Sequence, residues 1–434
     1  LVPEATECTT DWASGQSVGV GSSVGGMFVQ AVLYPVSATE IVQAWDVRLP
    51  YREADGGTQW QCVIAHSDGS LLMSRNVVQY FCQPDPVTFK VFPGDSPVPG
   101  TPGLAAPVAS GDSECVMRWQ NEQTPCPNDL GDGRVLMTVG PNQYSPHGWI
   151  NDEQFEHCAI LNGGAVVQTC GNNAWVHTAE LPPVIGTNIQ NRTFVPALEW
   201  SDTASKKSVA VVHAFAVVND WHDRMMTLGF DECAGNFQHV NSQIGGVTQG
   251  VGGDALRIVV DGAPTGMYGN NGNTADGRID DGRPYTINYS LETSEGRPSA
   301  LDRTVLYHEL GHALSFRLHV NYFIGNPEPT GLSEGWSDYL AIALTHEPGD
   351  SPTAPYPVFS WPAKQSVSPY NHFYFGARLF PYAAGFGHSP LRYRHIDSST
   401  NWDDFAGFPI NPNHAEVLNP TIPHYVGQVW ATML

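Results

Sequence analysis

Two histidines four residues apart, with a glutamate directly after the first, constrain this chain more than any other feature. His308, Glu309 and His312 lie in residues 304–316, where most other side chains are apolar. On a helix, residues four apart leave one face about one turn apart, so both imidazoles can reach a single ion. Glu309 is turned to the side and can approach a water on that ion, but not the ion itself. The pattern predicts a buried, metal-binding helix over residues 300–318.

A second pair of ligand-type residues follows the two histidines. Glu334 and Asp338 are again four apart, in a predicted second helix over residues 333–345 with Ser333 as its N-cap. Glu334 supplies a third protein ligand and leaves a fourth position open, which is typical of catalytic zinc. Asp338, one turn further on, can accept a hydrogen bond from a ligand imidazole and fix its tautomer. The two helices therefore predict a catalytic zinc site.

The alternative is a chance match in a buried helix, because the chain contains 16 histidines. Two helices that each carry ligand-type residues at this spacing are hard to explain by packing alone, so we favour the metal site. Zinc would lower the pKa of its bound water, Glu309 would remove the proton, and the hydroxide would attack a polarised carbonyl. Donors for the developing oxyanion would come from outside these helices. The candidates are Tyr322, His424 and Tyr425.

The charge of the chain argues against two classes of function. Lys and Arg number 20 against 43 Asp and Glu, a formal net charge of −23. A chain this acidic repels phosphate backbones and anionic lipid, so we expect neither nucleic acid nor a membrane as a partner. No apolar run reaches the 18 or so residues that a membrane-spanning helix needs.

The cysteines indicate export to an oxidising compartment. All eight lie in the first 233 residues, which is typical of disulfides in a loop-rich region. Few basic residues, 44 Gly, 34 Pro and a start at Leu1 without a signal pattern are also typical of a processed, secreted protein. Eight cysteines allow about 105 pairings. Proximity suggests Cys62 with Cys82, Cys115 with Cys126, and Cys158 with Cys170.

Short strands and loops are expected before the two helices. Apolar runs over residues 26–82 predict a small antiparallel sheet with a hairpin turn at Asp68. Periodic apolar residues predict a helix over residues 208–228, with Gly229 as its stop. The acidic residues 276–282 could hold Ca2+, although their spacing does not match an EF-hand loop, and a solvated turn is the alternative.

With these residues in view, the chain resembles the fungalysin family of secreted zinc metalloendopeptidases, which have a thermolysin-like catalytic fold. Residues 334–338, Glu-Gly-Trp-Ser-Asp, agree residue for residue with the glutamate motif of that family. Further segments similar to family motifs are residues 145–149 (Ser-Pro-His-Gly-Trp), 171–173 (Gly-Asn-Asn), 219–237 (a helix end followed by Gly-Phe-Asp-Glu-Cys-Ala-Gly-Asn-Phe) and 424–434 (His-Tyr-Val-Gly-Gln-Val-Trp-Ala-Thr-Met-Leu).

The resemblance implies roles for individual residues. His308, His312 and Glu334 would be the zinc ligands, and Glu309 would be the general base. By analogy with a late histidine of thermolysin-like enzymes, His424 would be the oxyanion donor or a second acid. The alternative for His424 is a helix-start histidine hydrogen-bonded to solvent.

The resemblance also implies an α+β architecture in three parts. Residues 1–86 would form a small propeptide-like β domain, the C-terminal lobe of a propeptide. Residues 87–300 would form the β-rich N-terminal lobe of the catalytic domain, and residues 301–434 its helical zinc-binding lobe. Family propeptides are chaperones and inhibitors of their own enzymes, so a zymogen is expected. An ordinary accessory β domain is the alternative for the first part.

One departure from the family concerns the late helix. Family catalytic domains continue beyond it, whereas this chain ends at Leu434, so we expect a helical lobe that is incomplete at its C-terminus or completed by a second chain. Gln428 also replaces the glutamate that is usual in that helix.

The expected function is that of a secreted, extracellular zinc-dependent endopeptidase that hydrolyses internal peptide bonds of proteins or peptides. An aminopeptidase on the same scaffold is less favoured, because no motif offers an acidic anchor for a free amine. A latent or structural component, with an intact but blocked or incomplete zinc site, is the alternative from another class.

Overall fold

The structure is a computed structural model, and part of the chain is described in it. The described residues are 28–37, 40–53, 56–76, 86–107, 132–146, 148–150, 158, 168–180, 192–241, 243–244, 247–248, 250–263, 269–270, 277–291, 297–319, 327–363, 371–397, 399–412, 419 and 421–434.

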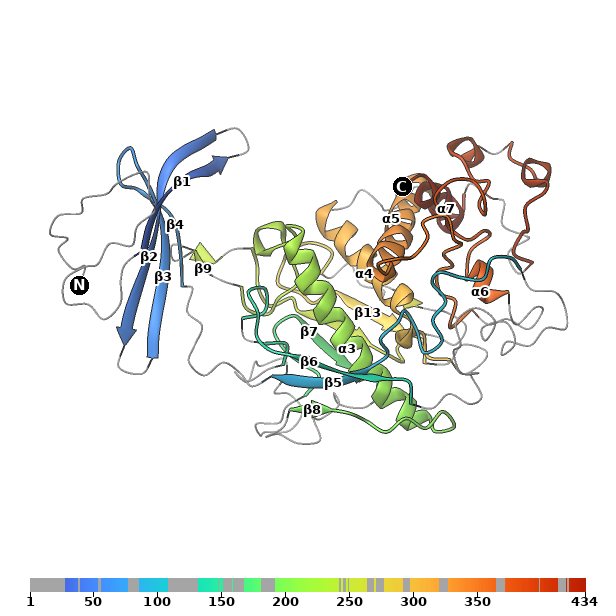
Figure 1. Ribbon diagram of the computed structural model, residues 1–434, viewed down its shortest axis with the longest axis horizontal. Helices are drawn as coiled ribbons and strands as arrows, with labels where there is room; N and C mark the ends of the chain where they lie inside the picture. The colour runs from blue at the N-terminus through green and yellow to red at the C-terminus, as the bar shows by residue number, and fades with distance from the viewer. Residues whose placement is uncertain are drawn as a thin grey trace. The chain divides into compact units, whose positions relative to one another are not determined.

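The chain forms two compact units, each with its own strands (Figure 1). Unit 1 comprises Leu1–Asp85 with Asn241–Gly250, and unit 2 comprises Pro86–Val240 with Val251–Leu434. In unit 1, four strands pair antiparallel in chain order, as the sequence predicted, and two short strands form a separate antiparallel pair. The strands are β1 (Phe28–Ser37), β2 (Glu40–Glu53), β3 (Gly56–Ala65), β4 (Leu71–Asn76), β9 (Gln243–Ile244) and β10 (Val247–Thr248).

Unit 2 combines two small sheets with helices, an α+β arrangement. One sheet has the order β6-β5-β8 and the other the order β12-β13-β11-β7, in which β7, β11 and β13 are parallel and β12 is antiparallel. The strands are β5 (Val87–Val91), β6 (Val135–Val139), β7 (Ala174–His177), β8 (Thr193–Phe194), β11 (Leu256–Val259), β12 (Gly269–Asn270) and β13 (Thr286–Tyr289). The helices are α3 (Thr203–Thr227), α4 (Arg303–Leu318), α5 (Pro327–Thr345), α6 (His372–Phe375) and α7 (Pro423–Met433), with 3-10 turns η2 (Glu232–Ala234), η3 (Ser299–Leu301), η4 (Tyr393–Ile396) and η5 (Trp402–Phe405).

A single apolar cluster joins both sheets of unit 2 to α3 and α4. Phe89 of β5 packs against Phe194 of β8 and Phe215 of α3, with ring centroids 5.2 and 5.7 Å apart. Leu306 and Leu310 of α4 belong to the same cluster. In Figure 1, α3 runs diagonally past strands β5, β6 and β7. Helices α4, α5 and α7 lie together towards the upper right of unit 2. The metal-binding motif is therefore on a helix fixed by the core.

Two helix boundaries show what the sequence predicted well and what it did not. The helix over residues 208–228 is α3, which begins earlier, because the Asp202 carboxylate caps the amides of Ala204 and Ser205. It stops as predicted before Gly229, whose φ is 96°.

The predicted start of the second helix, with Ser333 as its N-cap, is wrong. Helix α5 begins at Pro327, so Ser333 lies inside it. Gly331 looks like a break in the sequence, but α7 packs so close that a Cβ there would lie 2.5 Å from the Val426 side chain. A glycine is therefore needed within this helix.

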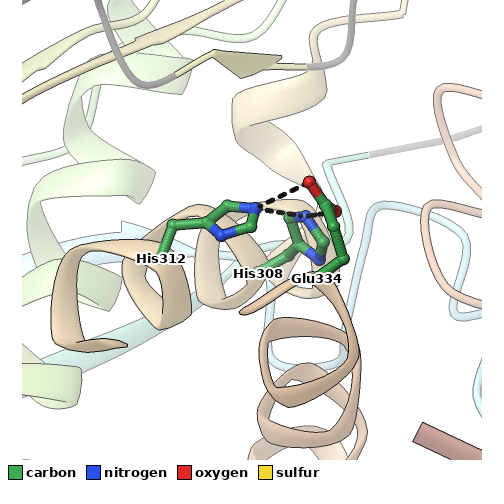
Figure 2. A group of neighbouring side chains, drawn as sticks. All are labelled: His308, His312 and Glu334. Atoms are coloured by element: carbon green, nitrogen blue, oxygen red, sulfur yellow. Dashed lines mark hydrogen bonds and ion pairs between the residues drawn. The ribbon is translucent and has the colours of Figure 1, made fainter. Parts of the chain in front are cut away.

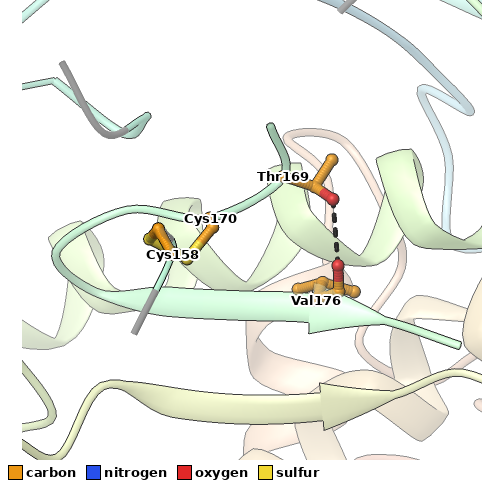
Figure 3. The surroundings of a disulfide bond; sticks show 4 residues. All are labelled: Cys158, Thr169, Cys170 and Val176. Carbon is orange, nitrogen blue, oxygen red and sulfur yellow. Dashed lines mark hydrogen bonds between the residues drawn. A yellow bond between two sulfur atoms is a disulfide. The ribbon is translucent and has the colours of Figure 1, made fainter. Parts of the chain in front are cut away.

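One predicted disulfide, Cys158–Cys170, is present, with the Cα atoms 5.7 Å apart. Figure 3 shows it beside β7, where the Thr169 hydroxyl donates to the Val176 carbonyl at 2.9 Å. The suggested pair Cys62–Cys82 is wrong, because Cys62 has a free thiol. Both cysteines of the suggested pair Cys115–Cys126 lie outside the described residues.

Three sequence motifs that resemble the family meet in one buried hydrogen-bond network. The Asp223 carboxylate near the end of α3 accepts from the hydroxyl of Ser145 at 2.6 Å and the indole of Trp149 at 2.9 Å. Asn173 donates to Ser145 at 2.9 Å and to Asn219 at 3.1 Å. These motifs therefore tie loops of the β-rich region to α3, far along the chain from the predicted ligands.

Of the helices in the described ranges, none is both long and apolar enough to span a bilayer.

We expect Asp223→Asn to destabilise the fold in a pH-dependent way. Burial raises the pKa of Asp223, but hydrogen bonds from His222, Ser145 and Asn142 outweigh it and hold the pKa below its ordinary value. The carboxylate therefore stabilises the fold above its unfolded pKa of about 3.9, and this contribution is lost as the pH falls through the folded pKa. Chemical denaturation should give a loss of about 1–3 kcal/mol at pH 7, and a smaller loss below about pH 4.

The matched control is Asp403→Asn, at an exposed carboxylate. It should change the unfolding free energy by less than about 0.5 kcal/mol. A loss for Asp223→Asn that does not shrink in acid would contradict the role given to this carboxylate.

Candidate metal centre

The N-terminus of α4 is fixed by a buried cap. Asp302 accepts from the Thr304 amide at 2.8 Å, and its other oxygen accepts from the Trp361 amide at 3.1 Å. From this start, one face of α4 enters the apolar core, and His308 and His312 occupy another with exposed fractions of only 3% and 6%. At Gly311 a Cβ would lie 2.8 Å from the Ser337 Cα, so α4 and α5 cross almost in backbone contact.

Helix α7 approaches α5 just as closely, at Glu334. A Cβ on Gly427 would lie 2.4 Å from the Glu334 Cβ, and one on Gly335 would lie 2.7 Å from the Gly427 carbonyl oxygen. The glutamate therefore has little freedom to move away from α4. The two glycine contacts bring α4, α5 and α7 together around one point.

At that point the three predicted ligand side chains converge (Figure 2). The Nε2 atoms of His308 and His312 are 3.1 Å apart. The two carboxylate oxygens of Glu334 lie 3.3 Å from Nε2 of His308 and 3.5 Å from Nε2 of His312. Donor atoms around a tetrahedral zinc ion lie about 3.3 Å apart, because each is about 2.0–2.1 Å from the metal. The spacing therefore fits zinc.

The hydrogen bonds on the outer side of the two imidazoles support the same conclusion. Nδ1 of His308 donates to Asp338 at 2.8 Å, because a carboxylate only accepts. Nδ1 of His312 lies 2.9 Å from the Ser333 hydroxyl, which contacts the Ser315 hydroxyl at 2.9 Å. Ser315 already donates to the His312 carbonyl, so Ser333 donates to Ser315 and accepts from Nδ1 of His312.

Both Nε2 atoms therefore face each other as acceptors. Two lone pairs at this distance repel unless a proton or a metal ion lies between them. In addition, one buried oxygen of Glu334, Oε2, makes no hydrogen bond within the described part of the chain. An unbonded buried carboxylate oxygen beside two inward-facing imidazole nitrogens is the donor set that a divalent cation requires.

Asp338 is the centre of a network that the sequence revealed only in part. Arg378 donates to both of its oxygens, from Nε at 2.6 Å and from Nη2 at 2.8 Å. The Tyr382 hydroxyl makes a further short hydrogen bond to it. Asp338 was predicted to orient an imidazole, whereas Arg378, Tyr382 and Ser315 were missed, since no local pattern connects them to the ligands.

The charges of the site shift several pKa values. Burial lowers the pKa of His308, but the Asp338 and Glu334 carboxylates favour the protonated imidazole, outweigh the burial and raise the pKa to about 9. Burial raises the pKa of Asp338, but Arg378 and His308 hold it well below its usual range. Glu334 likewise has a lowered pKa, because the nearby histidines outweigh its burial. The site is therefore negative and attracts either a proton or a metal cation.

Glu309 lies beside this group without sharing its hydrogen bonds. Its side chain is 7% exposed, and among the described residues it has no hydrogen bond or ion pair. Burial raises the pKa of its carboxyl group, and the two histidines only partly offset this. A carboxylate that is buried, uncommitted and readily protonated is suited to exchange protons.

The three predicted oxyanion donors differ in their placement. His424, at the start of α7, is mostly exposed, and its Nε2 lies 3.6 Å from Oε1 of Glu334. Tyr425 is buried and donates its hydroxyl to the His395 carbonyl at 2.8 Å, so that hydroxyl is already committed. Tyr322 lies outside the described residues.

Glu334 raises the pKa of His424, but desolvation and the nearby positive groups outweigh it, so the pKa lies below its ordinary value. An imidazole that is neutral near pH 7 can donate one hydrogen bond and accept another.

In the acidic segment 276–282, the two carboxylates that the structure describes have protein partners. Asp280 accepts from the Val251 amide at 2.9 Å and lies 3.5 Å from Arg317, while Asp281 accepts from the Arg283 amide at 3.2 Å. Asp276 lies outside the described residues.

Comparison with known proteins gives one family. The family model described as fungalysin metallopeptidase (M36) matches residues 119–434. Extracellular metalloproteinases named MEP are similar to the chain: that of Neosartorya fischeri is 26% identical over 320 residues, and that of Pyricularia oryzae is 28% identical over 322 residues. Each alignment covers 71% of this chain and 43% of the relative, so the chain spans less than half the length of these relatives.

We expect Gly427→Ala to weaken metal binding through the helix contact. The added Cβ would overlap the Glu334 Cβ and lie 2.8 Å from the Gly331 carbonyl oxygen, so α5 and α7 must separate. Titration with Zn2+ against a chromogenic chelator should show a Kd raised by about tenfold or more, within the range found for lost supporting contacts. Overpacking should also cost about 1–3 kcal/mol of stability.

Gly387→Ala is the control, because nothing lies within 4 Å of the added Cβ. An unchanged Zn2+ affinity in Gly427→Ala would show that this contact does not fix Glu334.

Proposed function

Because this chain belongs to the fungalysin metallopeptidase family, we propose that it is a zinc-dependent endopeptidase that hydrolyses internal peptide bonds of proteins. The observation that carries the proposal is the convergence of His308, His312 and Glu334 on one point, at the spacing of zinc ligands, with the uncommitted Glu309 carboxylate beside them. Three protein ligands leave one position for water or substrate, which is the arrangement of catalytic zinc.

In this proposal, His308, His312 and Glu334 hold the ion. When bound, zinc supplies Lewis-acid chemistry: it polarises a carbonyl oxygen and lowers the pKa of a water molecule towards about 7. Glu309 takes the proton from the attacking water and returns it to the leaving amine. The raised pKa of Glu309 suits both transfers, because a stronger base also gives a more stable protonated form.

The remaining residues position these groups. Asp338 and Ser333 hold the Nδ1–H groups of the two imidazoles, so that each Nε2 carries its lone pair inward. We assign His424 as a hydrogen-bond donor to the developing oxyanion, because its exposed ring lies beside the ligand set, with Nε2 3.6 Å from Oε1 of Glu334.

The remaining expectations belong to the same proposal. We propose that the protein is secreted, as the word extracellular in the names of its relatives suggests. Residues 1–86 would be a propeptide-like β domain that keeps the enzyme as a zymogen, residues 87–300 the β-rich lobe, and residues 301–434 the helical lobe. Ca2+ at residues 276–282 is a further proposal.

Incubation of the isolated chain with unstructured casein, with and without a zinc chelator, tests the endopeptidase proposal. Mass spectrometry should reveal fragments from internal cuts that disappear when chelator is present and return when Zn2+ is restored. Absence of internal cuts, with one zinc ion still bound per chain, would overturn the proposal in favour of a latent component.

We expect Glu309→Gln to abolish hydrolysis while metal binding is retained. Glutamine has nearly the same shape but cannot take a proton, and a general base contributes about 10²- to 10⁴-fold to the rate. The measurement is kcat/KM on an internally quenched peptide together with zinc content. The control is Glu347→Gln, at an exposed residue after α5, which should leave both unchanged. Activity within a few fold of wild type would exclude Glu309 as the base.

A further inference from the structure

Phe359 has an unusual backbone conformation close to the metal centre. Its φ is 62°, and Arg192 is the one other non-glycine residue with positive φ in the described ranges. The left-handed region is unfavourable for a bulky side chain, because Cβ crowds the following carbonyl group. Residues held in such conformations cluster at functional sites, where the surroundings impose them.

The surroundings of Phe359 do impose this conformation. Its amide donates to the Thr304 hydroxyl at 2.8 Å, at the start of α4. The Val358 carbonyl of the same peptide group accepts from the Ala377 amide at 3.0 Å and lies 2.0 Å from where a Cβ of Gly376 would be. On the other side of Phe359, its carbonyl accepts from the Ala363 amide at 3.1 Å. The segment is therefore clamped between the first turn of α4 and the loop that carries Arg378.

This backbone directs the Phe359 ring onto the outer network of the metal centre. The ring is perpendicular to the His308 imidazole, at 89°, with the centroids 4.9 Å apart. The Arg378 guanidinium lies over the same ring, with its Cζ 5.2 Å from the centroid. His308 and Arg378 are both hydrogen-bonded to Asp338. His308, Asp338 and Arg378 thus form a hydrogen-bonded series, and Phe359 packs against its two outer members.

The alternative is that Phe359 simply fills the core. Its exposed fraction is 4%, and it belongs to the large apolar cluster. Filling volume explains the burial but not the left-handed backbone, since an apolar side chain can fill a core from an ordinary backbone region. Contact with the imidazole does explain it. The His308 ring turns about its Cβ–Cγ bond, and one hydrogen bond at Nδ1 tolerates a range of ring angles. An aromatic ring packed against the imidazole restricts this rotation.

We propose that Phe359 is a positioning residue that fixes the plane of the His308 imidazole for metal binding. The inference rests on the proposed zinc site and adds to it a residue outside the ligands and their hydrogen-bond partners. Its prediction is that loss of the ring weakens metal binding by more than the loss of fold stability explains.

The test compares Phe359→Leu and Phe359→Gly with Phe215→Leu. Phe215 is also fully buried, but it packs against Phe89 in the β-rich part of unit 2. Each variant is measured as the full chain, for Zn2+ affinity by chelator competition, for the visible d–d spectrum of the Co2+-substituted protein, and for the Tm without metal. We expect Zn2+ affinity to fall about 10- to 100-fold in both Phe359 variants, with an altered Co2+ spectrum. Phe215→Leu should lower Tm and leave affinity and spectrum unchanged.

Phe359→Gly is the deciding variant if Leu is not tolerated at this backbone position, because glycine adopts the left-handed region without strain. Wild-type affinity and an unchanged Co2+ spectrum in that variant would overturn the proposal and leave Phe359 a core residue. His308→Ala separates this outcome from failure of the zinc site itself. If wild type binds one Zn2+ and His308→Ala does not, the site stands whatever Phe359 does; if wild type binds none, both proposals fail.

Discussion

The metal centre depends on how buried charge is neutralised. A carboxylate removed from water is costly unless opposite charge and hydrogen bonds compensate it. Asp338 is compensated by Arg378, Tyr382 and His308, all within the protein. Glu334 faces two imidazole Nε2 atoms, which compensate its charge only when a proton or a cation lies between them. A divalent cation supplies the positive charge that Glu334 needs, so the same buried charges that shape the fold also bind the metal.

Close helix contacts hold that charge in place. Glycines at the crossings let the backbones of α4, α5 and α7 approach to distances at which any side chain would collide, and Gly311 and Gly427 bring the ligand-bearing segments together. Because glycine costs helix stability, its use within helices is explained by this packing. The strained backbone of Phe359 also lowers stability at the metal centre, and the hydrogen bond to the first turn of α4 holds it in this conformation. Helix and backbone stability is therefore lower at the positions that set the geometry of the three metal ligands.

The sequence revealed the parts of the site that local spacing controls. Four-residue spacing on a helix places His308 and His312 on one face, and this holds wherever the helix lies. Arg378 and Tyr382 follow Asp338 by 40 and 44 residues, across loops whose path no periodicity encodes. The start of α5 was missed because Ser333 is a favoured N-cap residue type, and only the contact of Gly331 with α7 explains a glycine within the helix. Strand pairing in unit 1 was predictable from alternation, whereas the network around Asp223 depends on tertiary contacts.

Zinc K-edge X-ray absorption of the purified full chain reports the ligands of the bound ion itself and therefore tests whether His308, His312 and Glu334 hold it. We expect one zinc ion per chain with only nitrogen and oxygen neighbours at about 2.0–2.1 Å, and outer-shell scattering from two imidazole rings. Sulfur neighbours at about 2.3 Å would place the ion at cysteines instead, and absence of imidazole scattering would remove the two histidines from the site. Either result would show that His308, His312 and Glu334 do not hold the zinc ion.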